Sequence, residues 1–427
     1  MRNPVGVAVV GCGYWGANYL RVFNELPGAT LVAACDQRAD RLQEVARRFP
    51  GVAVTPHLEE ALAMEGVDVV VVATAATTHF AVTRACLDAG KHVLVEKPLT
   101  TESSDAAALG VLAEAKSLVL MVGHTFVYNS GIRKVKEYLD GGADQIYYLY
   151  ARRTNLGPIR QDVNALWDLA SHDISIFNYL VGGPPEWVSA VGVKVLRNCR
   201  EDVGFVSLGY RNNIVGHIHV SWADPHKTRE VVVVGSERRI VFDDMNGLEQ
   251  VRVFEKGVRV AATEPAAFGD LQLYIRDGDI LSPHLQPSEP LKSQCRHFLE
   301  CVTEPHAPLT GAREGQYVVN ALEAIHRSIA LQGAPVRVER RAIPRRRHPE
   351  RRQPVGTNGV LSHVPIERRI GLRVRTADRR SRITPDASWP RVVFNGEGRN
   401  EMISAGNGSG LPGAPPKSPA LVPSLRQ

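Results

Sequence analysis

The sequence predicts an α/β domain with a doubly wound parallel sheet, followed by an α+β domain with a large, mostly antiparallel sheet. Three observations support this expectation. The chain has 427 residues, enough for two or three domains. Over residues 1–122 apolar runs alternate with helical stretches, as repeated βα units require. Over residues 123–338 many short strand patterns follow one another, several with alternating polar and apolar residues.

Composition excludes several classes of protein. Apolar residues make up 44% and charged residues 22% of the chain, which is typical of a globular protein. No apolar run reaches the roughly 18 residues of a membrane span, and the first run is too short for a signal peptide. The six cysteines form no Cys-x-x-Cys pair, so we expect a cytoplasmic protein without disulfides and without a metal site.

Residues 339–427 differ from the rest. The net charge of +6 divides into −6 for residues 1–336 and +12 for residues 337–427, where 19 basic residues face seven acidic ones. With almost no hydrophobic period, this tail is expected to be disordered. Three explanations stay open: a solvated tail without specific function, an arm that binds polyanions, and an extension read out of frame. Nucleic acid is not an expected partner, because aromatic residues are not interleaved with the charges.

The first predicted strand ends in a glycine-rich loop. Val5–Val10 is continuously apolar, as in a buried parallel strand, and the motif Gly-Cys-Gly-Tyr-Trp-Gly follows it. Gly11 would allow a tight turn, Gly13 would let the backbone approach a pyrophosphate, and Gly16 would allow close helix–strand packing. An amphipathic helix from Ala17 onward completes the arrangement of a dinucleotide-binding Rossmann fold. Tyr14 and Trp15, inside the motif, are further cofactor-binding candidates.

A carboxylate follows the second predicted strand, Thr30–Cys35. Asp36 lies 20 residues after Gly16, where it could accept hydrogen bonds from the adenosine ribose. A carboxylate there repels a 2′-phosphate, so NAD is favoured over NADP. Arg38 lies nearby and keeps NADP open as the less favoured cofactor.

The βα alternation continues to Val122. We expect strands at Val67–Ala73, Lys91–Val95 and Leu118–Val122 and helices at Thr77–Ala89 and Glu102–Lys116. In such sheets ligands lie at the carboxyl ends of the strands. That rule selects four polar residues, namely Thr74, His79, Glu96 and Lys97. A partly buried lysine at this edge could polarise a substrate oxygen, although a surface lysine paired with Glu96 is the simpler interpretation.

A second polar group lies in a helical stretch that runs to Leu180. Asp168 and His172 are four residues apart and therefore share a helical face. An imidazole can accept a hydroxyl proton and a carboxylate can orient it. A surface Asp–His pair of little consequence has the same spacing.

The second domain is expected to cover the cleft with a sheet, so that the substrate lies between the two domains. Expected strands are 145–153, 188–196, 203–210, 214–222, 230–234, 239–242 and 250–254, with Asn212-Asn213 as a hairpin turn and helices at 291–302 and 311–331. Arg152, Arg153 and Arg160 could pair with a diphosphate, or could be solvated surface charges. His217 and His219 share one strand face, but no third metal ligand lies near them in the sequence.

Together these motifs resemble the Gfo/Idh/MocA family, the glucose–fructose oxidoreductase and inositol dehydrogenase-like enzymes. The resemblance covers about Val5 to Val338 and includes Ala-Thr-Ala-Ala-Thr-Thr-His at residues 73–79, with Ala76 where the family usually has proline. It implies that Lys97 and His172 transfer a proton with the substrate hydroxyl, supported by Asp168. It also implies that Glu96 and His79 line the cofactor pocket and that the protein is a homo-oligomer.

Three stretches, 123–129, 153–157 and 221–227, resemble the subgroup that oxidises C3 of UDP-N-acetylglucosamine and its uronic acid. The expected function is therefore hydride transfer between a secondary hydroxyl of a nucleotide-activated sugar and NAD. Candidate substrate residues are His124, Phe126, Tyr128, Arg153, Asn155 and Arg160. Two alternatives stay open: a dehydrogenase or ketoreductase for inositol, free or glycosidic sugars, and a non-catalytic NAD-binding regulator with a basic tail.

Overall fold

The first sheet has six parallel strands. The computed structural model describes residues 4–141, 144–157, 159–160, 162–196, 199–260, 273–304 and 306–339. The first sheet has the order β3-β2-β1-β4-β5-β6, with every neighbouring pair parallel. Its strands are β1 Val5–Val10, β2 Ala29–Cys35, β3 Ala53–Thr55, β4 Val69–Val72, β5 His92–Val95 and β6 Leu120–Val122. Because the chain crosses over on both sides of β1, this is the doubly wound sheet that the sequence predicts.

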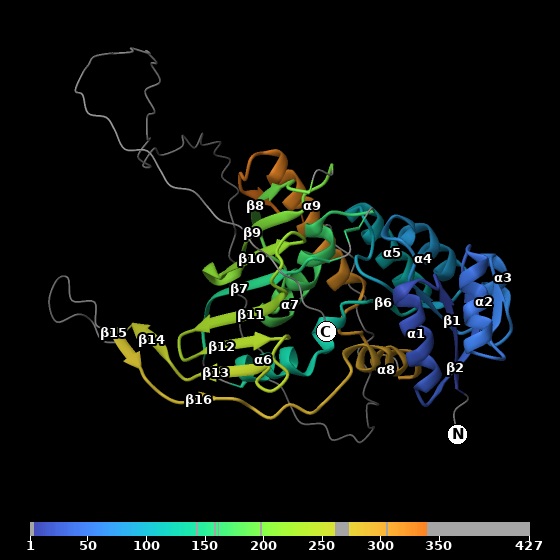
Figure 1. Cartoon of the computed structure of the whole chain (residues 1–427), viewed down its shortest axis with the longest axis horizontal. Helices are drawn as coiled ribbons and strands as arrows, with labels where there is room; N and C mark the ends of the chain where they lie inside the picture. The colour runs from blue at the N-terminus through green and yellow to red at the C-terminus, as the bar shows by residue number, and fades with distance from the viewer. Residues whose placement is uncertain are drawn as a thin grey trace, which may run out of the picture. The chain divides into compact units, whose positions relative to one another are not determined.

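Helices cover both faces of this sheet (Figure 1). They are α1 Tyr14–Glu25, α2 Ala39–Arg48, α3 Leu58–Ala63, α4 His79–Asp88 and α5 Ser103–Lys116. Alternate residues of β1 belong to two separate cores: Val7 and Val9 pack with α1, whereas Ala8 and Val10 pack with residues of α4 and α5. A continuous apolar run is needed for such a strand because both of its faces are buried.

The second sheet has nine strands in the order β16-β13-β12-β11-β7-β10-β9-β8-β17. Within it β7 and β10 pair in parallel, and the other neighbouring pairs are antiparallel. The strands are β7 Ile146–Thr154, β8 Trp187–Val193, β9 Val203–Gly209, β10 Val215–Ser221, β11 Thr228–Gly235, β12 Arg239–Asp243, β13 Val251–Phe254, β16 Ile280–Leu281 and β17 Val336–Arg337. Asn212 and Asn213 both have φ near +60° and join β9 to β10, which confirms the predicted hairpin.

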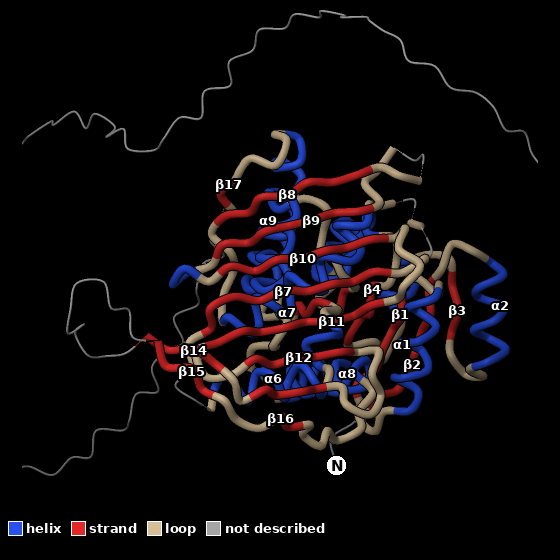
Figure 2. Tube along the Cα trace, turned by 60° about the vertical axis from the view of Figure 1, so that its left-hand side comes forward, coloured by secondary structure: helices blue, strands red, loops and turns tan. Residues whose placement is uncertain are grey.

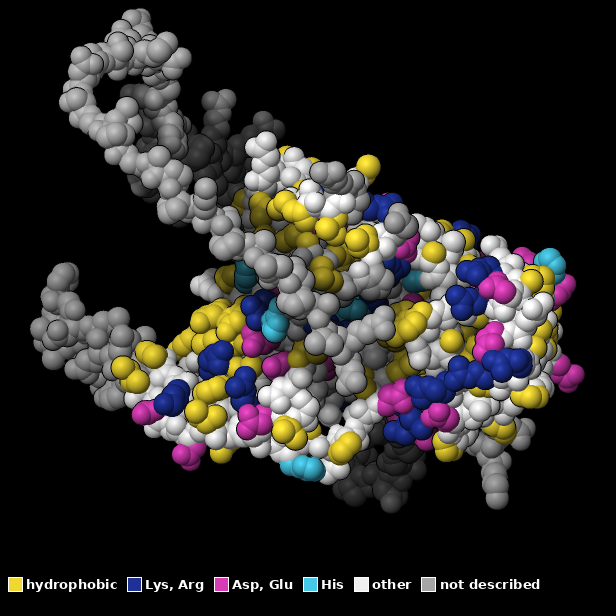
Figure 3. Space-filling model, in the orientation of Figure 1, with side chains coloured by type: hydrophobic (Ala, Val, Ile, Leu, Met, Phe, Trp, Pro, Cys, Tyr) yellow, Lys and Arg dark blue, Asp and Glu magenta, His cyan; other side chains and the backbone are white. Residues whose placement is uncertain are grey.

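One face of the second sheet is covered by helices and the other is open (Figure 2). The covering helices are α6 Ser130–Asp140, α7 Ser171–Val181 and α9 Ala312–Ala330, while α8 Pro290–Thr303 returns to α1 on the first sheet. Alternate residues of β8, β9 and β10 are exposed on the open face. Figure 3 shows hydrophobic side chains gathered around these strands.

The predicted fold class is therefore confirmed, with differences in detail. The helix expected at Thr77–Ala89 starts with a separate 3-10 turn, Ala76–Thr78, before α4. The sequence interpretation missed α2, α3 and β3, as well as the small hairpin of β14 Gly257–Val260 and β15 Leu273–Arg276. The boundaries after residues 122 and 338 stay predictions, and the tail from residue 340 lies outside the described residues. None of the described helices is both long and apolar enough to span a membrane.

Candidate active site

The glycine-rich loop joins β1 to α1, and two of its glycines are required by close backbone contacts. Gly11 has φ +91°, and a Cβ there would lie 2.6 Å from the carbonyl oxygen of Ala73. A Cβ on Gly16 would lie 1.8 Å from the carbonyl oxygen of Gly11. Gly13 differs, because no atom of the described chain lies within 4 Å of its Cβ position. The loop is therefore tightly packed against other backbone at Gly11 and Gly16, whereas the space beside Gly13, at the amino end of α1, is free.

A cavity of about 650 Å³ adjoins this loop, and its lining includes Gly11, Gly13, Asp36, Arg38 and Thr74. The Asp36 carboxylate accepts the backbone N–H groups of Cys12 at 2.6 Å and Arg38 at 2.9 Å. These contacts fix Asp36 at the carboxyl end of β2. An open glycine backbone at a helix amino end and a carboxylate at the next strand end fit the phosphates and ribose of a dinucleotide.

Three predicted cofactor residues are exposed. The Arg38 guanidinium pairs with Asp40 at 2.6 Å, and both side chains are more than 60% exposed. Tyr14 is 80% exposed and Trp15 39% exposed, and the two rings meet edge to face. None of these three side chains is buried. We expect any contact that they make with the cofactor to form when the cofactor binds.

His79 holds two strand ends together. Its Nδ1 lies 2.7 Å from the carbonyl oxygen of Pro98 and its Nε2 lies 3.2 Å from that of Thr74. Burial lowers the pKa of His79, and the two carbonyl groups partly offset this effect. His79 thus braces the loops after β4 and β5, and the loop after β4 lines the cavity.

Glu96 is the centre of a buried hydrogen-bond chain. Its carboxylate accepts the hydroxyl of Tyr19 at 2.7 Å and the backbone N–H of Lys97 at 3.1 Å. The Tyr19 oxygen in turn accepts the amide of Gln294 at 3.1 Å, and the carbonyl group of Gln294 accepts the hydroxyl of Thr125 at 2.7 Å. Burial raises the pKa of Glu96 above its ordinary value. Tyr19, Gln294 and Thr125 were missed by the sequence interpretation, since Tyr19 has the pattern of a helical core residue and the other two belong to no motif.

Lys97 and Asp168 meet although they are 71 residues apart. The Lys97 ammonium donates to Asp168 Oδ1 at 3.1 Å and to the Asp168 carbonyl oxygen at 2.9 Å. Arg160 adds a second cation, with Nη1 3.2 Å from the same Oδ1. Burial raises the pKa of Asp168, but the charges of Lys97 and Arg160 outweigh it, and the net pKa lies below the ordinary value. Asp168 therefore stays ionised and holds the Lys97 ammonium at the end of β5.

Asp168 belongs to a π-helical turn, Leu166–Ala170, that leads into α7. Such turns are rare and often occur at functional sites. His172 lies in the first turn of α7 with its ring edge to face with Phe126, centroids 5.1 Å apart. Its Nδ1 has no hydrogen-bond partner among the described residues. The structure thus does not pair the Asp168 carboxylate with the imidazole, as the helical spacing suggested, but directs it to Lys97 and Arg160.

Electrostatics keep His172 neutral. Burial lowers the pKa of His172 well below its ordinary value, and the nearby charges of Lys97 and Arg153 lower it further. A neutral imidazole near an ammonium group can accept a proton from a hydroxyl that the ammonium polarises.

The predicted substrate residues do not form one surface. Arg153 is buried in a bidentate ion pair with Asp173, 2.8 Å at its shortest, and its guanidinium lies 4.3 Å from the Phe126 ring centroid. Tyr128 is 1% exposed and bonds to Thr310, so it belongs to the core. His124 is also buried, and neither of its ring nitrogens has a partner among the described residues.

Asn155 and Arg160 are partly exposed. The backbone N–H of Asn155 donates to Ser221 at 3.0 Å, which ties this loop to the end of β10. Arg160 pairs with Asp162 at 2.5 Å in addition to Asp168. Arg160 is therefore already neutralised by two carboxylates. On β10, His219 stacks on Phe205, and the described residues bring no third metal ligand to His217 and His219.

Comparison with known proteins supports this description of the two parts. The family model "Oxidoreductase family, NAD-binding Rossmann fold" of the Gfo/Idh/MocA type matches residues 5–124, and the Gfo/Idh/MocA C-terminal domain matches residues 146–241. The UDP-N-acetylglucosamine 3-dehydrogenase of Acidithiobacillus ferrooxidans is 28% identical over 309 residues, 70% of this chain and 89% of that protein.

Two further matches cover different shares of the chain. The inositol 2-dehydrogenase of Rhodococcus erythropolis is 37% identical over 144 residues, which is 33% of this chain and 41% of that protein. The crystal structure of GenD2 from gentamicin A biosynthesis, in complex with NAD, superposes with a TM-score of 0.67 and 28% identity. That superposition covers 80% of this chain and 98% of GenD2.

Proposed function

Because the chain belongs to the Gfo/Idh/MocA family of oxidoreductases, we propose that it transfers hydride between a secondary hydroxyl of a nucleotide-activated sugar and NAD. One observation carries the proposal. The Lys97 ammonium is fixed by Asp168 directly after β5, and a neutral histidine, His172, lies close enough to be affected by its charge. That edge of the sheet is also where the dinucleotide cavity opens.

The residues around the cavity fit a dinucleotide. The amino end of α1 at Gly13 would hold the pyrophosphate, and Asp36 would accept the ribose hydroxyls. NAD, when bound, supplies the hydride acceptor. NAD is preferred to NADP in this proposal because a second negative charge beside Asp36 would be repelled, and because Arg38 pairs with Asp40.

Proton transfer is assigned to two side chains. Lys97 donates a hydrogen bond to the substrate oxygen and favours its ionisation, while His172 accepts the hydroxyl proton. Asp168 is a positioning residue, since its carboxylate holds the ammonium of Lys97 at 3.1 Å. In the reverse direction the same groups return the proton to a ketone oxygen.

The substrate class rests on the relatives. The UDP-N-acetylglucosamine 3-dehydrogenase aligns with 89% of its length, which supports oxidation at C3 of a UDP-N-acetylhexosamine. A glycosidic sugar without a diphosphate is the second candidate, supported by the equally identical GenD2. The ion pair of Arg153 with Asp173 also favours it, because that arginine is not free to bind a diphosphate.

NADH formation across a panel of sugars tests both candidates. The panel contains UDP- and dTDP-sugars, inositols, free sugars and aminoglycoside precursors, and the product is followed by near-ultraviolet absorbance. Lys97→Ala and His172→Ala are expected to lose turnover by roughly 10²- to 10⁴-fold while still binding NAD. Lys116→Ala and His284→Ala are matched controls, since both side chains are exposed and lie outside the site.

Turnover with a UDP-sugar, lost in the two site variants alone, supports the proposal. Turnover restricted to a glycosidic sugar or an inositol keeps the site assignment and replaces the substrate. Full turnover in Lys97→Ala and His172→Ala contradicts the assignment of the site.

A further inference from the structure

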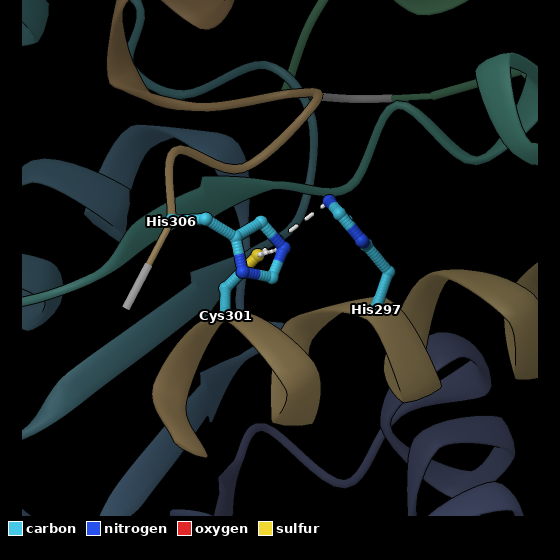
Figure 4. Close-up of side chains that lie close together, drawn as sticks. All are labelled: His297, Cys301 and His306. Atoms are coloured by element: carbon cyan, nitrogen blue, oxygen red, sulfur yellow. Dashed lines mark hydrogen bonds between the residues drawn. The ribbon is translucent and has the colours of Figure 1, made fainter. Parts of the chain in front are cut away.

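A cluster of three potential metal ligands lies at the carboxyl end of α8. His297 and Cys301 are one helical turn apart on α8, and His306 follows in the next loop. Figure 4 shows the three side chains converging. The Cys301 sulfur lies 3.5 Å from His297 Nε2 and 3.4 Å from His306 Nε2. None of the three belongs to the Lys97 site.

These distances match tetrahedral coordination. Zinc lies about 2.3 Å from a cysteine sulfur and about 2.0–2.1 Å from a histidine nitrogen, so tetrahedral angles separate sulfur and nitrogen by about 3.6 Å. We propose that His297, Cys301 and His306 form a binding site for a zinc ion, with water at the fourth position. The mixed nitrogen and sulfur donors suit this borderline-soft cation.

The other ring nitrogens have the partners that metal-binding histidines use. His306 Nδ1 lies 2.5 Å from the carbonyl oxygen of Glu304, and His297 Nδ1 lies 3.7 Å from the carboxylate of Glu300. The Glu304 carbonyl favours the proton on Nδ1 of His306, and the Leu309 N–H that donates to His297 Nε2 favours the proton on Nδ1 of His297. Both Nε2 atoms next to the thiol are therefore acceptors. Such outer partners orient histidine ligands and increase their basicity.

Hydrogen bonds occupy the same atoms when no metal is bound. The thiol of Cys301 can donate to either histidine, and the backbone N–H of Leu309 donates to His297 Nε2 at 3.1 Å. Burial raises the pKa of Cys301 to about 11, so zinc must displace the thiol proton. Zinc must also displace the Leu309 N–H from His297 Nε2.

The position indicates a stabilising role. The His297 ring lies 5.6 Å from the Tyr128 ring, and Thr310 bonds to both Tyr128 and Val122 at the end of β6. A bound ion would tie α8 to the loop that carries Leu309 and Thr310. Because His306 is exposed, the ion can enter from solvent.

Cobalt(II), a spectroscopic substitute for zinc, tests the site in the full-length chain after treatment with a chelator. Wild type should bind one equivalent, with a thiolate-to-cobalt charge-transfer band and the visible bands of tetrahedral cobalt. Zinc should displace the cobalt and raise the melting temperature. Cys301→Ser should lose the charge-transfer band, and His306→Ala, an exposed position that the fold tolerates, should bind about tenfold more weakly or not at all.

Cys199→Ser is the matched control, because Cys199 is an exposed cysteine outside the cluster. It should bind cobalt as wild type does. The proposal is overturned if wild type shows no thiolate band, if the band survives in Cys301→Ser, or if Cys199→Ser abolishes it. Circular dichroism and NAD binding establish that each variant is folded.

Discussion

At the scale of single residues, the site is an arrangement of buried charges around one neutral imidazole. Lys97 and Arg160 share the carboxylate of Asp168, and Arg153 is neutralised by Asp173. Burying a charge is costly unless a partner and hydrogen bonds compensate it, and each of these pairs has both. His172 lies near several of the cations and has no carboxylate partner among the residues that the structure describes, so its charged form is disfavoured.

A pH profile follows from this environment. The ordinary pKa of histidine is about 6.5, and that of His172 lies well below it. Because the neutral form accepts the substrate proton, kcat/KM for oxidation should show no fall on acidification through pH 6.5. The fall should begin only at lower pH, where His172 becomes protonated.

The measurement is kcat/KM between pH 5 and 8 with saturating NAD. Arg229→Gln removes one of the cations that lower the pKa of His172, so the acid limb should move to higher pH. If the kcat/KM of wild type falls tenfold per pH unit below pH 6.5, and Arg229→Gln shows the same profile, the role of His172 is contradicted.

Cofactor choice depends on Asp36. Asp36→Asn removes the negative charge and keeps only one of the two oxygens that accept the backbone N–H groups of Cys12 and Arg38. Placing like charges side by side costs up to several kcal/mol, so the ratio of kcat/KM for NADP to that for NAD should rise about tenfold or more. Steady-state kinetics with both cofactors measures this ratio. An unchanged ratio of the two kcat/KM values, with an unchanged melting temperature, would contradict the proposed preference for NAD.

At the scale of elements, the sequence interpretation found the strands with continuous apolar runs. It missed the short β3 and α3, and also α2 and α6, which have 10 and 11 residues. The apolar runs of β1 and β4 are visible because parallel strands buried on both faces must be continuously apolar. β3 has three residues, and α3 has six, too few to show a period. The π-helical turn at Asp168 left no signal either, since its extra residue per turn is set by packing rather than by residue type.

Two glycines of the glycine-rich loop are expected to have different effects: Gly16 on stability and Gly13 on cofactor binding. Gly16→Ala would drive a Cβ to 1.8 Å from the Gly11 carbonyl, so α1 must shift and the melting temperature should fall clearly. Gly13→Ala meets no described atom within 4 Å and has φ −70°, which alanine adopts without strain. The apo protein should therefore melt within about 2 °C of wild type, an unstrained change being worth well under 1 kcal/mol.

Gly13→Ala should nevertheless weaken NAD binding about tenfold or more, because the Cβ fills space where the pyrophosphate approaches the backbone. Thermal melting with and without NAD gives both readouts from one experiment. Equal NAD affinity in Gly13→Ala and wild type would contradict the placement of the phosphates.

At the scale of the whole molecule, the site exists only because the two sheets are brought together by folding. Lys97 follows β5 of the first sheet, whereas Asp168 and His172 precede and begin α7, which packs on the second. The sequence motifs predicted these residues. The distance of 3.1 Å between Lys97 Nζ and Asp168 Oδ1, however, depends on long-range packing that the spacing of residues in the sequence cannot reveal. The same packing explains why Tyr128 and Arg153, predicted as substrate residues, are buried in contacts within the protein.

The open face of the second sheet is where we expect two copies of the chain to meet in a homo-oligomer. Tyr148, Val191, Val193, Phe205 and Val215 are each between 39% and 46% exposed on strands of this sheet. Exposed apolar patches of this kind commonly mark contacts between chains. We infer that a second copy of the chain covers this face, and analytical ultracentrifugation of Phe205→Lys against wild type would detect the loss of assembly.

The last prediction concerns the basic tail. Removing residues 341–427 deletes 17 basic and six acidic residues and changes the net charge of the chain from +6 to −5. Every residue proposed to bind NAD or to transfer the proton lies between Gly11 and His172, and Asn320 bonds to the backbone of Glu339 inside the retained part. Turnover should therefore stay within about twofold of the full chain, whereas salt-dependent binding to polyanions, if the full chain has it, should disappear. Loss of turnover in a truncated chain with an unchanged melting temperature would instead assign the tail a part in the reaction.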